Sequence, residues 1–122
     1  MIKLKRNKGL SLLGLAMKAR CAAGGETAVL DAIKSGKAHL VLIAEDASDN
    51  SRKLYSDKSR FYEVPYLVWG TKEQLGHAIG KEERSAVAVC DVGLARAIMS
   101  NIVLPEATDE TIGGMNGENK NT

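Results

Sequence analysis

A Gly-Gly-Glu turn at residues 24–26 precedes a predicted helical segment that is followed by two cations, and an apolar run, LVLIAED, occupies residues 40–46. Glycine permits the backbone angles of a sharp turn, and the first N–H groups of a helix have no partner within the helix. A helix that begins at this turn can therefore hold an anion through its backbone, at the edge where the apolar strand also ends. The chemistry that these residues predict is binding of an anionic ligand.

The sequence contains few residue patterns that indicate catalysis. Nucleophilic catalysis needs a serine or cysteine beside a base, and the two histidines, His39 and His77, fall at a strand start and within a predicted helix. Glu45 and Asp46 follow an apolar strand, as acidic residues do in many α/β sites, but Asp46 can equally cap the helix behind it. Dinucleotide, phosphate-loop and metal-ligand spacings are absent from the sequence. A small enzyme using Glu45 and Asp46 is an alternative, and no cofactor or metal is expected.

Basic residues concentrate in the first part of the chain. Residues 1–102 hold 16 Lys and Arg against 11 Asp and Glu, whereas residues 103–122 hold one Lys and four acidic residues. A basic body suits a polyanionic partner. The cations of residues 3–8 are expected to form either a flexible basic arm that adds affinity or a solvated terminus, and the second is favoured. The apolar run after them is too short for a membrane span. Cys21 and Cys90 are predicted to be reduced core residues of a cytoplasmic protein.

Apolar spacing and capping signals locate the predicted elements. Helices are expected at residues 9–19, 26–35, 48–62, 71–80 and 91–102, and strands at residues 21–23, 40–44, 66–69 and 85–90. Ser48 or Asp49 can cap the third helix. Thr71 and Gln74 fit a capping box for the fourth, and Asp91 can cap the last. Because strands alternate with helices, the predicted fold class is α/β, with helices on both faces of a sheet of about four strands.

Residues 1–104 are predicted to form a single domain. Residues 105–122 have almost nothing to bury and are predicted to be a disordered polar tail. The few aromatic residues gather near the third helix and the strand after it, where core packing explains them at least as well as stacking on RNA bases. They are Tyr55, Phe61, Tyr62, Tyr66 and Trp69.

Several ordered blocks of sequence resemble one known family. They are LGLAMKAR at 13–20, GGE at 24–26, KAHLVLIAEDAS at 37–48, SRKLYSDKSRFYEVPY at 51–66 and LGHAIGKEERSAVAVCD at 75–91. With these blocks the chain resembles the superfamily of kink-turn-binding ribosomal proteins that includes L7Ae, and most of all its small bacterial members. The resemblance implies a three-layer αβα sandwich around a four-stranded mixed sheet. It also implies RNA binding without enzymatic activity or a cofactor.

The same resemblance implies where RNA would bind. The site would comprise the turn and first helical turn at residues 24–31, the loop at residues 80–85, and the loop that begins at residue 45. The candidate RNA-binding residues are Gly24, Gly25, Glu26, Thr27, Ala28, Asp31, Lys34, Lys37, Glu45, Lys81, Arg84 and Ser85. Archaeal and eukaryotic members of the family carry Asn, Glu and Lys where this chain has Thr27, Ala28 and Asp31.

Two hypotheses about function follow. The first is a non-catalytic protein that binds structured RNA, a kink-turn or a related internal loop, in ribosomal or regulatory RNA. The second is a protein-interaction module of the same fold with weak or lost RNA specificity, which the replacements at Ala28 and Asp31 favour. In either case a monomer is expected, with no membrane and no small-molecule substrate as partner.

Overall fold

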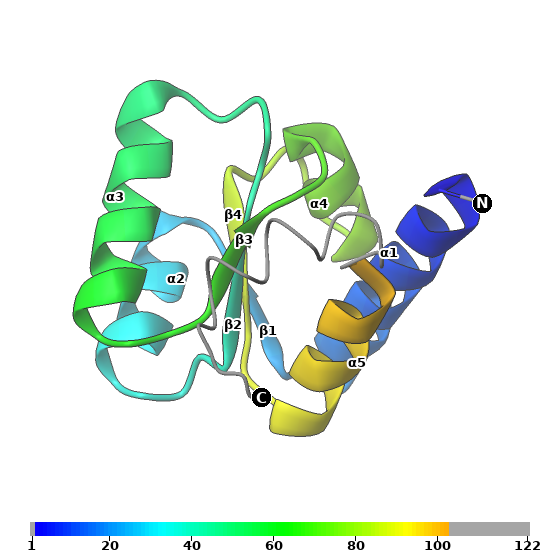
Figure 1. Cartoon of the computed structure of the whole chain (residues 1–122), viewed down its shortest axis with the longest axis horizontal. Helices are drawn as coiled ribbons and strands as arrows, with labels where there is room; N and C mark the ends of the chain where they lie inside the picture. Colours follow the sequence, from blue (N-terminus) through cyan, green and yellow to red (C-terminus); the bar gives the residue numbers. More distant parts are fainter. Residues whose placement is uncertain (1, 103–122) are drawn as a thin grey trace.

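The protein folds as a sheet between two layers of helices. A computed structural model describes residues 2–102. In chain order the elements are α1 (Ile2–Lys18), β1 (Ala22–Gly24), α2 (Glu26–Lys34), β2 (Leu40–Ile43), α3 (Asp49–Phe61), β3 (Tyr66–Val68), α4 (Lys72–Ala78), β4 (Ala86–Val89) and α5 (Val92–Ile102). Figure 1 shows the sheet edge-on, with α2 and α3 on one face and α1, α4 and α5 on the other. The predicted three-layer αβα sandwich is confirmed.

The four strands form one mixed sheet in the order β1-β4-β2-β3. Strand β4 is antiparallel to β1 and β2, and β2 is parallel to β3. Every residue of β2 and β4 is buried, which confirms the expectation of an apolar central strand covered on both faces. In this register the ends of β1, β2 and β3 and the start of β4 lie at one end of the sheet, so the loops that follow or precede them meet there.

Side-chain caps begin three of the helices, as predicted. The Ser48 hydroxyl accepts a hydrogen bond from the N–H of Ser51 (3.1 Å) at the start of α3. Thr71 and Gln74 form a reciprocal capping box at α4, and the Asp91 carboxylate accepts from the N–H of Leu94 (2.8 Å) at α5. These caps satisfy N–H groups that have no partner inside the helix.

The expectation that Asp46 caps the helix behind it is wrong. Its carboxylate instead accepts a hydrogen bond from the backbone N–H of Lys72 (2.8 Å), the first residue of α4. Ser48 already occupies the capping position of α3. Asp46 therefore ties the end of β2 to a helix 26 positions later in the chain, a contact that spacing along the sequence does not reveal.

Helix α1 starts at Ile2, not near residue 9 as predicted, so the cations of residues 3–8 belong to a helix and not to an irregular terminus. The glycine at position 9 is explained by packing, because a Cβ there would lie 3.0 Å from the ring of Trp69. None of the described helices is long and apolar enough to cross a membrane. The predicted tail at 105–122 lies outside the described residues.

The cysteines and two of the aromatic residues are less buried than a core position requires. Cys21 and Cys90 lie just outside β1 and β4, where the chain leaves the sheet, and both are only partly buried. The N–H of Cys90 donates to the carbonyl of Cys21 (2.7 Å). Tyr55 and Trp69 do belong to the core, but Phe61 and Tyr62 are exposed at the end of α3.

Candidate functional site

The two glycines before α2 serve different purposes. Gly25 has φ of 101°, a left-handed backbone conformation that favours glycine, and it forms the N-cap of α2. Gly24 is in β1 and is crowded, because a Cβ there would lie 2.5 Å from Ile79 Cδ1 and 3.5 Å from Arg84 Nε. The first glycine thus leaves room for the Ile79 side chain against β1, with Arg84 in van der Waals range, and the second lets the chain turn into α2.

Helix α2 begins without a side-chain cap, unlike α3, α4 and α5. Gly25 has no side chain, and no other described side chain caps the helix. The backbone N–H of Val29 is the first to bond within it, to the Gly25 carbonyl (2.9 Å). The N–H groups of the first turn are therefore open to an external acceptor, and the helix dipole favours an anionic one.

A hollow of about 260 Å³ opens beside this first turn. Its walls come from the start of α2, the start of α3 and the loop that precedes β4. The lining residues are Gly25, Glu26, Ser51, Tyr55, Glu83, Arg84, Ser85 and Ala86. Four of the candidate residues therefore meet here. Sequence reasoning did not name Ser51, Tyr55 and Glu83 as site residues. The available signals were a block of the family resemblance that contains the first two, and the predicted loop at residues 80–85 that contains the third.

Arg84 reaches this hollow from the loop at residues 80–85. One terminal nitrogen, NH1, donates to the Glu83 carbonyl (2.9 Å) and to the Glu82 carbonyl (3.4 Å). Its Nε is buried and has no hydrogen-bond partner among the residues that the structure describes. A buried donor without a partner is costly, so Nε would gain from an acceptor that reached it.

Tyr55 and Glu26 influence each other across the same hollow. Burial raises the pKa of the Tyr55 phenol above its ordinary value, and the negative charge of Glu26 raises it further. The phenol therefore stays neutral, as a hydrogen-bond donor or acceptor, at any physiological pH. The hollow thus combines a carboxylate acceptor, a neutral hydroxyl and the positive charge of Arg84.

Close packing on α4 positions the loop at residues 80–85. A Cβ on Gly76 would overlap the backbone carbonyl group of Glu82, so only glycine permits this approach. The Lys81 N–H donates to the Gly76 carbonyl (2.8 Å), and the Arg84 N–H donates to the Lys72 carbonyl (3.1 Å). Gly76 was not predicted to be a site residue, because the contact lies between segments that only the fold brings together.

The loop that begins at Glu45 lies beside the same segment. The Ala44 N–H donates to the Ser85 carbonyl (2.8 Å), and the Glu45 N–H donates to the Gly70 carbonyl (2.7 Å). These bonds place the exposed Glu45 next to the hollow. Thr27, Lys34 and Lys81, three further candidate residues, are exposed.

The remaining candidates lie further along α2 and just after its end. Ala28, Asp31 and Lys37 line a second hollow of about 350 Å³, together with Arg20 and Cys90. This hollow is bordered by β1 and not by α3, so the candidate residues divide between two hollows that share α2. Among the described residues, no group of three or more His, Cys, Asp and Glu side chains could hold a metal ion.

Comparison with known proteins identifies the family. A model of the ribosomal protein L7Ae/L30e/S12e/Gadd45 family matches residues 7–99. The chain belongs to this family. The matched region includes every candidate residue and both hollows.

Relatives in bacteria carry names that refer to RNA. The chain is 46% identical to the RNA-binding protein YlxQ of Bacillus subtilis (strain 168) over 89 residues, which are 73% of this chain and 89% of that protein. It is 37% identical over 91 residues to the RNA-binding protein YlxQ of Enterococcus faecium, covering 75% of this chain and 87% of that protein.

Solved structures share the fold. A Bacillus halodurans protein described as of unknown function aligns with a TM-score of 0.75 at 40% identity, covering 80% of this chain and 98% of that one. The Giardia lamblia 15.5kD RNA binding protein aligns with a TM-score of 0.65 at 22% identity, covering 83% of this chain and 87% of that one. At that lower identity the match supports the fold alone.

Proposed function

We propose that this protein binds structured RNA, without catalysis, at the hollow between α2, α3 and the loop at residues 80–85. The observation that carries the proposal is the uncapped first turn of α2, which opens into a hollow that also holds Arg84. Family membership and the names of the bacterial relatives support it.

Each group in the hollow has a suitable partner on RNA. The free N–H groups of α2 and the guanidinium of Arg84 can donate to phosphate oxygens, as helix N-termini and arginines do in other proteins. The Glu26 carboxylate can accept hydrogen bonds from the edge of an unpaired guanine. The hydroxyls of Ser51, Tyr55 and Ser85 can bond ribose or base edges.

We propose a kink-turn or a related internal loop as the preferred RNA, within ribosomal or regulatory RNA. A sharp bend brings phosphates together, so one helix N-terminus and a few cations can stabilise it, and the protein then selects the bent form from the RNA ensemble. Thr27, Ala28 and Asp31 replace the family's Asn, Glu and Lys, so in this chain recognition depends more on Glu26, Arg84 and the backbone.

The first experiment compares a kink-turn RNA with a plain duplex of equal length at near-physiological salt. We expect tighter binding of the kink-turn, and an affinity that falls as salt rises, with a slope of roughly 0.7–0.9 per phosphate contact on a log-log plot. Equal and weak binding of both RNAs would contradict kink-turn recognition. Binding that does not depend on salt would contradict phosphate contacts altogether.

A matched pair of variants locates the site. Arg84→Ala should weaken kink-turn binding by about tenfold or more, because a hydrogen bond to a charged partner contributes roughly 1.5–3 kcal/mol. Arg96→Ala removes the same charge from an exposed position that lines a hollow with His39 and Glu63 at the other end of the sheet, and should change affinity little. Equal losses in both variants would indicate a general charge effect.

A protein-interaction role is the competing proposal, and Asp31 is the residue that favours it, since a carboxylate repels phosphate. Asp31→Lys restores the cation of the family pattern. Under the RNA proposal this change should tighten kink-turn binding severalfold and leave duplex binding nearly unchanged. If the Asp31→Lys protein and its parent both fail to bind any structured RNA, the protein-interaction role becomes the better account.

A further inference from the structure

Two aromatic side chains are exposed side by side at the C-terminal end of α3. The Phe61 side chain is 77% exposed and that of Tyr62 is 39% exposed. Their ring centroids are 5.0 Å apart, with an angle of 75° between the ring planes. This edge-to-face pair holds both rings at the surface, with much of their area still open to water. Phenylalanine is rarely so exposed without a partner, so this pair needs an explanation.

The helix that ends in this pair carries more basic than acidic residues. Helix α3 carries four basic residues, Arg52, Lys53, Lys58 and Arg60, and two acidic residues, Asp49 and Asp57. Arg52 pairs with Asp49 (2.7 Å), and Asp57 is shared by Lys53 (3.0 Å) and Arg60 (2.6 Å). Lys58 has no ion-pair partner within the described part of the chain. Helix α3 as a whole therefore carries net positive charge, while the acidic Glu63 directly follows Tyr62 at its aromatic end.

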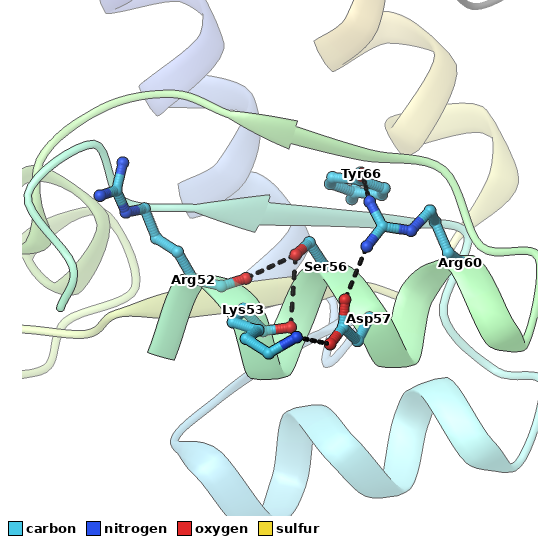
Figure 2. Close-up of polar contacts among 6 residues, drawn as sticks. All are labelled: Arg52, Lys53, Ser56, Asp57, Arg60 and Tyr66. Atoms are coloured by element: carbon cyan, nitrogen blue, oxygen red, sulfur yellow. Dashed lines mark hydrogen bonds and ion pairs between the residues drawn. The ribbon is translucent and has the colours of Figure 1, made fainter. Parts of the chain in front are cut away.

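Arg60, which directly precedes Phe61 in the chain, is held in a defined position by Asp57 and Tyr66, as Figure 2 shows. One terminal nitrogen of its guanidinium bonds the Asp57 carboxylate, and the other donates to the Tyr66 hydroxyl (2.8 Å). The guanidinium carbon lies 5.9 Å from the centre of the Tyr66 ring. The two cations beside Asp57 hold the pKa of this carboxyl below its usual value. A fixed guanidinium next to exposed rings loses little entropy when it meets a ligand.

The aromatic pair lies at the opposite end of α3 from the hollow. Ser51 and Tyr55 line the hollow, and Lys58 and Tyr62 follow them at spacings of three and four residues, so all four share one face of the helix. At a rise of about 1.5 Å per residue, Tyr62 lies about 16 Å along the axis from Ser51. Helices α2 and α3 both begin at the hollow and run in the same direction (Figure 1).

We propose that Lys58, Arg60, Phe61 and Tyr62 form a second RNA contact, on which unpaired bases of an RNA bound at the hollow stack. Bases stack on aromatic side chains with little sequence preference, and cations beside the rings follow the phosphate backbone. The excess of positive charge favours a polyanion over an apolar protein surface as the partner. This inference rests on the proposed function, because the RNA that reaches α3 is the one held at the hollow.

Three kink-turn RNAs test the inference. One is blunt-ended, and each of the other two has a single-stranded extension of about eight nucleotides, at the 5′ end in one and at the 3′ end in the other. The extension should tighten binding to the unaltered protein by about tenfold, since one stacked base contributes roughly 1–3 kcal/mol. In the double variant Phe61→Ser, Tyr62→Ser this gain should disappear, while affinity for the blunt RNA stays the same. Unchanged thermal unfolding would exclude a folding defect.

Leu15→Ser is the matched control. Leu15 is 51% exposed on α1, on the other face of the sheet, so its replacement removes exposed apolar surface away from the proposed contact. The tenfold gain should persist in this variant. In Phe61→Trp, stacking of a base on the introduced indole should quench its fluorescence with the extended RNA and not with the blunt one.

The two proposals fail in different ways. Absence of binding to the blunt kink-turn would contradict the proposed function at the hollow. Normal binding of the blunt RNA with no gain from either extension, or a gain that survives in the double variant, would overturn the second contact. In that case a protein partner would be the better explanation for the exposed rings.

Discussion

Helices α2 and α4 begin at the same end of the sheet, on opposite faces, and their first turns are built in opposite ways (Figure 1). At α4, Thr71 and Gln74 cap each other's backbone, and Asp46 accepts a further hydrogen bond from the N–H of Lys72. At α2, Gly25 offers no side chain and the first turn has no side-chain cap among the described residues. The first turn of α4 is capped by side chains, and the first turn of α2 is not.

Helix α4, whose first turn is capped, positions the loop that lies beside the uncapped first turn of α2. The loop at residues 80–85 bonds α4 through the carbonyls of Lys72 and Gly76, and the same loop carries Arg84 into the hollow beside α2. Because the N–H groups of its first turn are hydrogen-bonded, the start of α4 is well ordered where this loop contacts it. Stability and binding should therefore respond differently when each helix start is altered.

The largest effect is expected from Gly76→Ala. The added Cβ would overlap the carbonyl group of Glu82, and a backbone segment cannot yield as a side chain does. We expect a loss of about 3 kcal/mol in the free energy of unfolding, which exceeds the roughly 1 kcal/mol gained from the better helix propensity of alanine. Urea denaturation measures it.

Gly93→Ala is the control, because a Cβ there would meet only the Asp91 carboxylate, at 3.3 Å. It should raise the free energy of unfolding by about 1 kcal/mol or less, through the better helix propensity of alanine. Equal stability of the two variants would mean that the loop at residues 80–85 can move away from α4 freely, and that α4 does not position Arg84.

Glu26→Pro tests the open start of α2 directly. Proline at the first helical position removes one backbone N–H yet fits the helix, and the ψ of 149° at Gly25 suits a following proline. We expect RNA affinity to fall by about tenfold relative to Glu26→Ala, which removes the same carboxylate but keeps the N–H. Thermal unfolding of the two variants should differ little. Equal affinities would show that this N–H does not contact RNA.

Thr71→Ala removes the side-chain cap of α4. In contrast to Glu26→Pro, it should lower the stability of the protein and leave its RNA affinity nearly unchanged. Loss of the cap should lower the free energy of unfolding by about 1 kcal/mol. Affinity for RNA should stay within about twofold of the parent, because Thr71 does not line the hollow. A large loss of RNA affinity at an unchanged free energy of unfolding would indicate that RNA contacts the start of α4 and not the start of α2.

The smallest expected effect is on the pH dependence of stability, through Cys90, which follows the last residue of β4. Burial raises the pKa of this thiol, the neighbouring Cys21 raises it further, and Lys37 lowers it. Above about pH 8.5, where the unfolded thiol ionises, the folded state binds more protons, so stability falls as pH rises through the raised pKa. Urea denaturation between pH 7 and 9.5 should show a weaker decline in Cys90→Ala. Parallel curves for the two proteins would contradict this assignment.

Much of the fold could be predicted because its signals are local. Continuous apolar residues indicated the central strand, and the Thr71–Gln74 pair indicated a cap that the structure contains. The start of α1 was placed too late, because a glycine at position 9 resembles a helix boundary when the Trp69 ring that crowds it is unknown. Hydrogen-bonding and packing partners far apart in sequence leave no such local signal.

The sequence alone determined the α/β class, the Gly-Gly-Glu turn and the helix that follows it, since backbone preference and apolar spacing act over a few residues. Only the tertiary structure decided that Arg84 lies over Gly24, that Gly76 supports the loop before β4, and that Ser51 and Tyr55 complete the hollow. The tertiary structure also separated Asp31 from that hollow and left Phe61 in solvent. These outcomes depend on how the layers pack, and packing joins residues that the chain itself keeps apart.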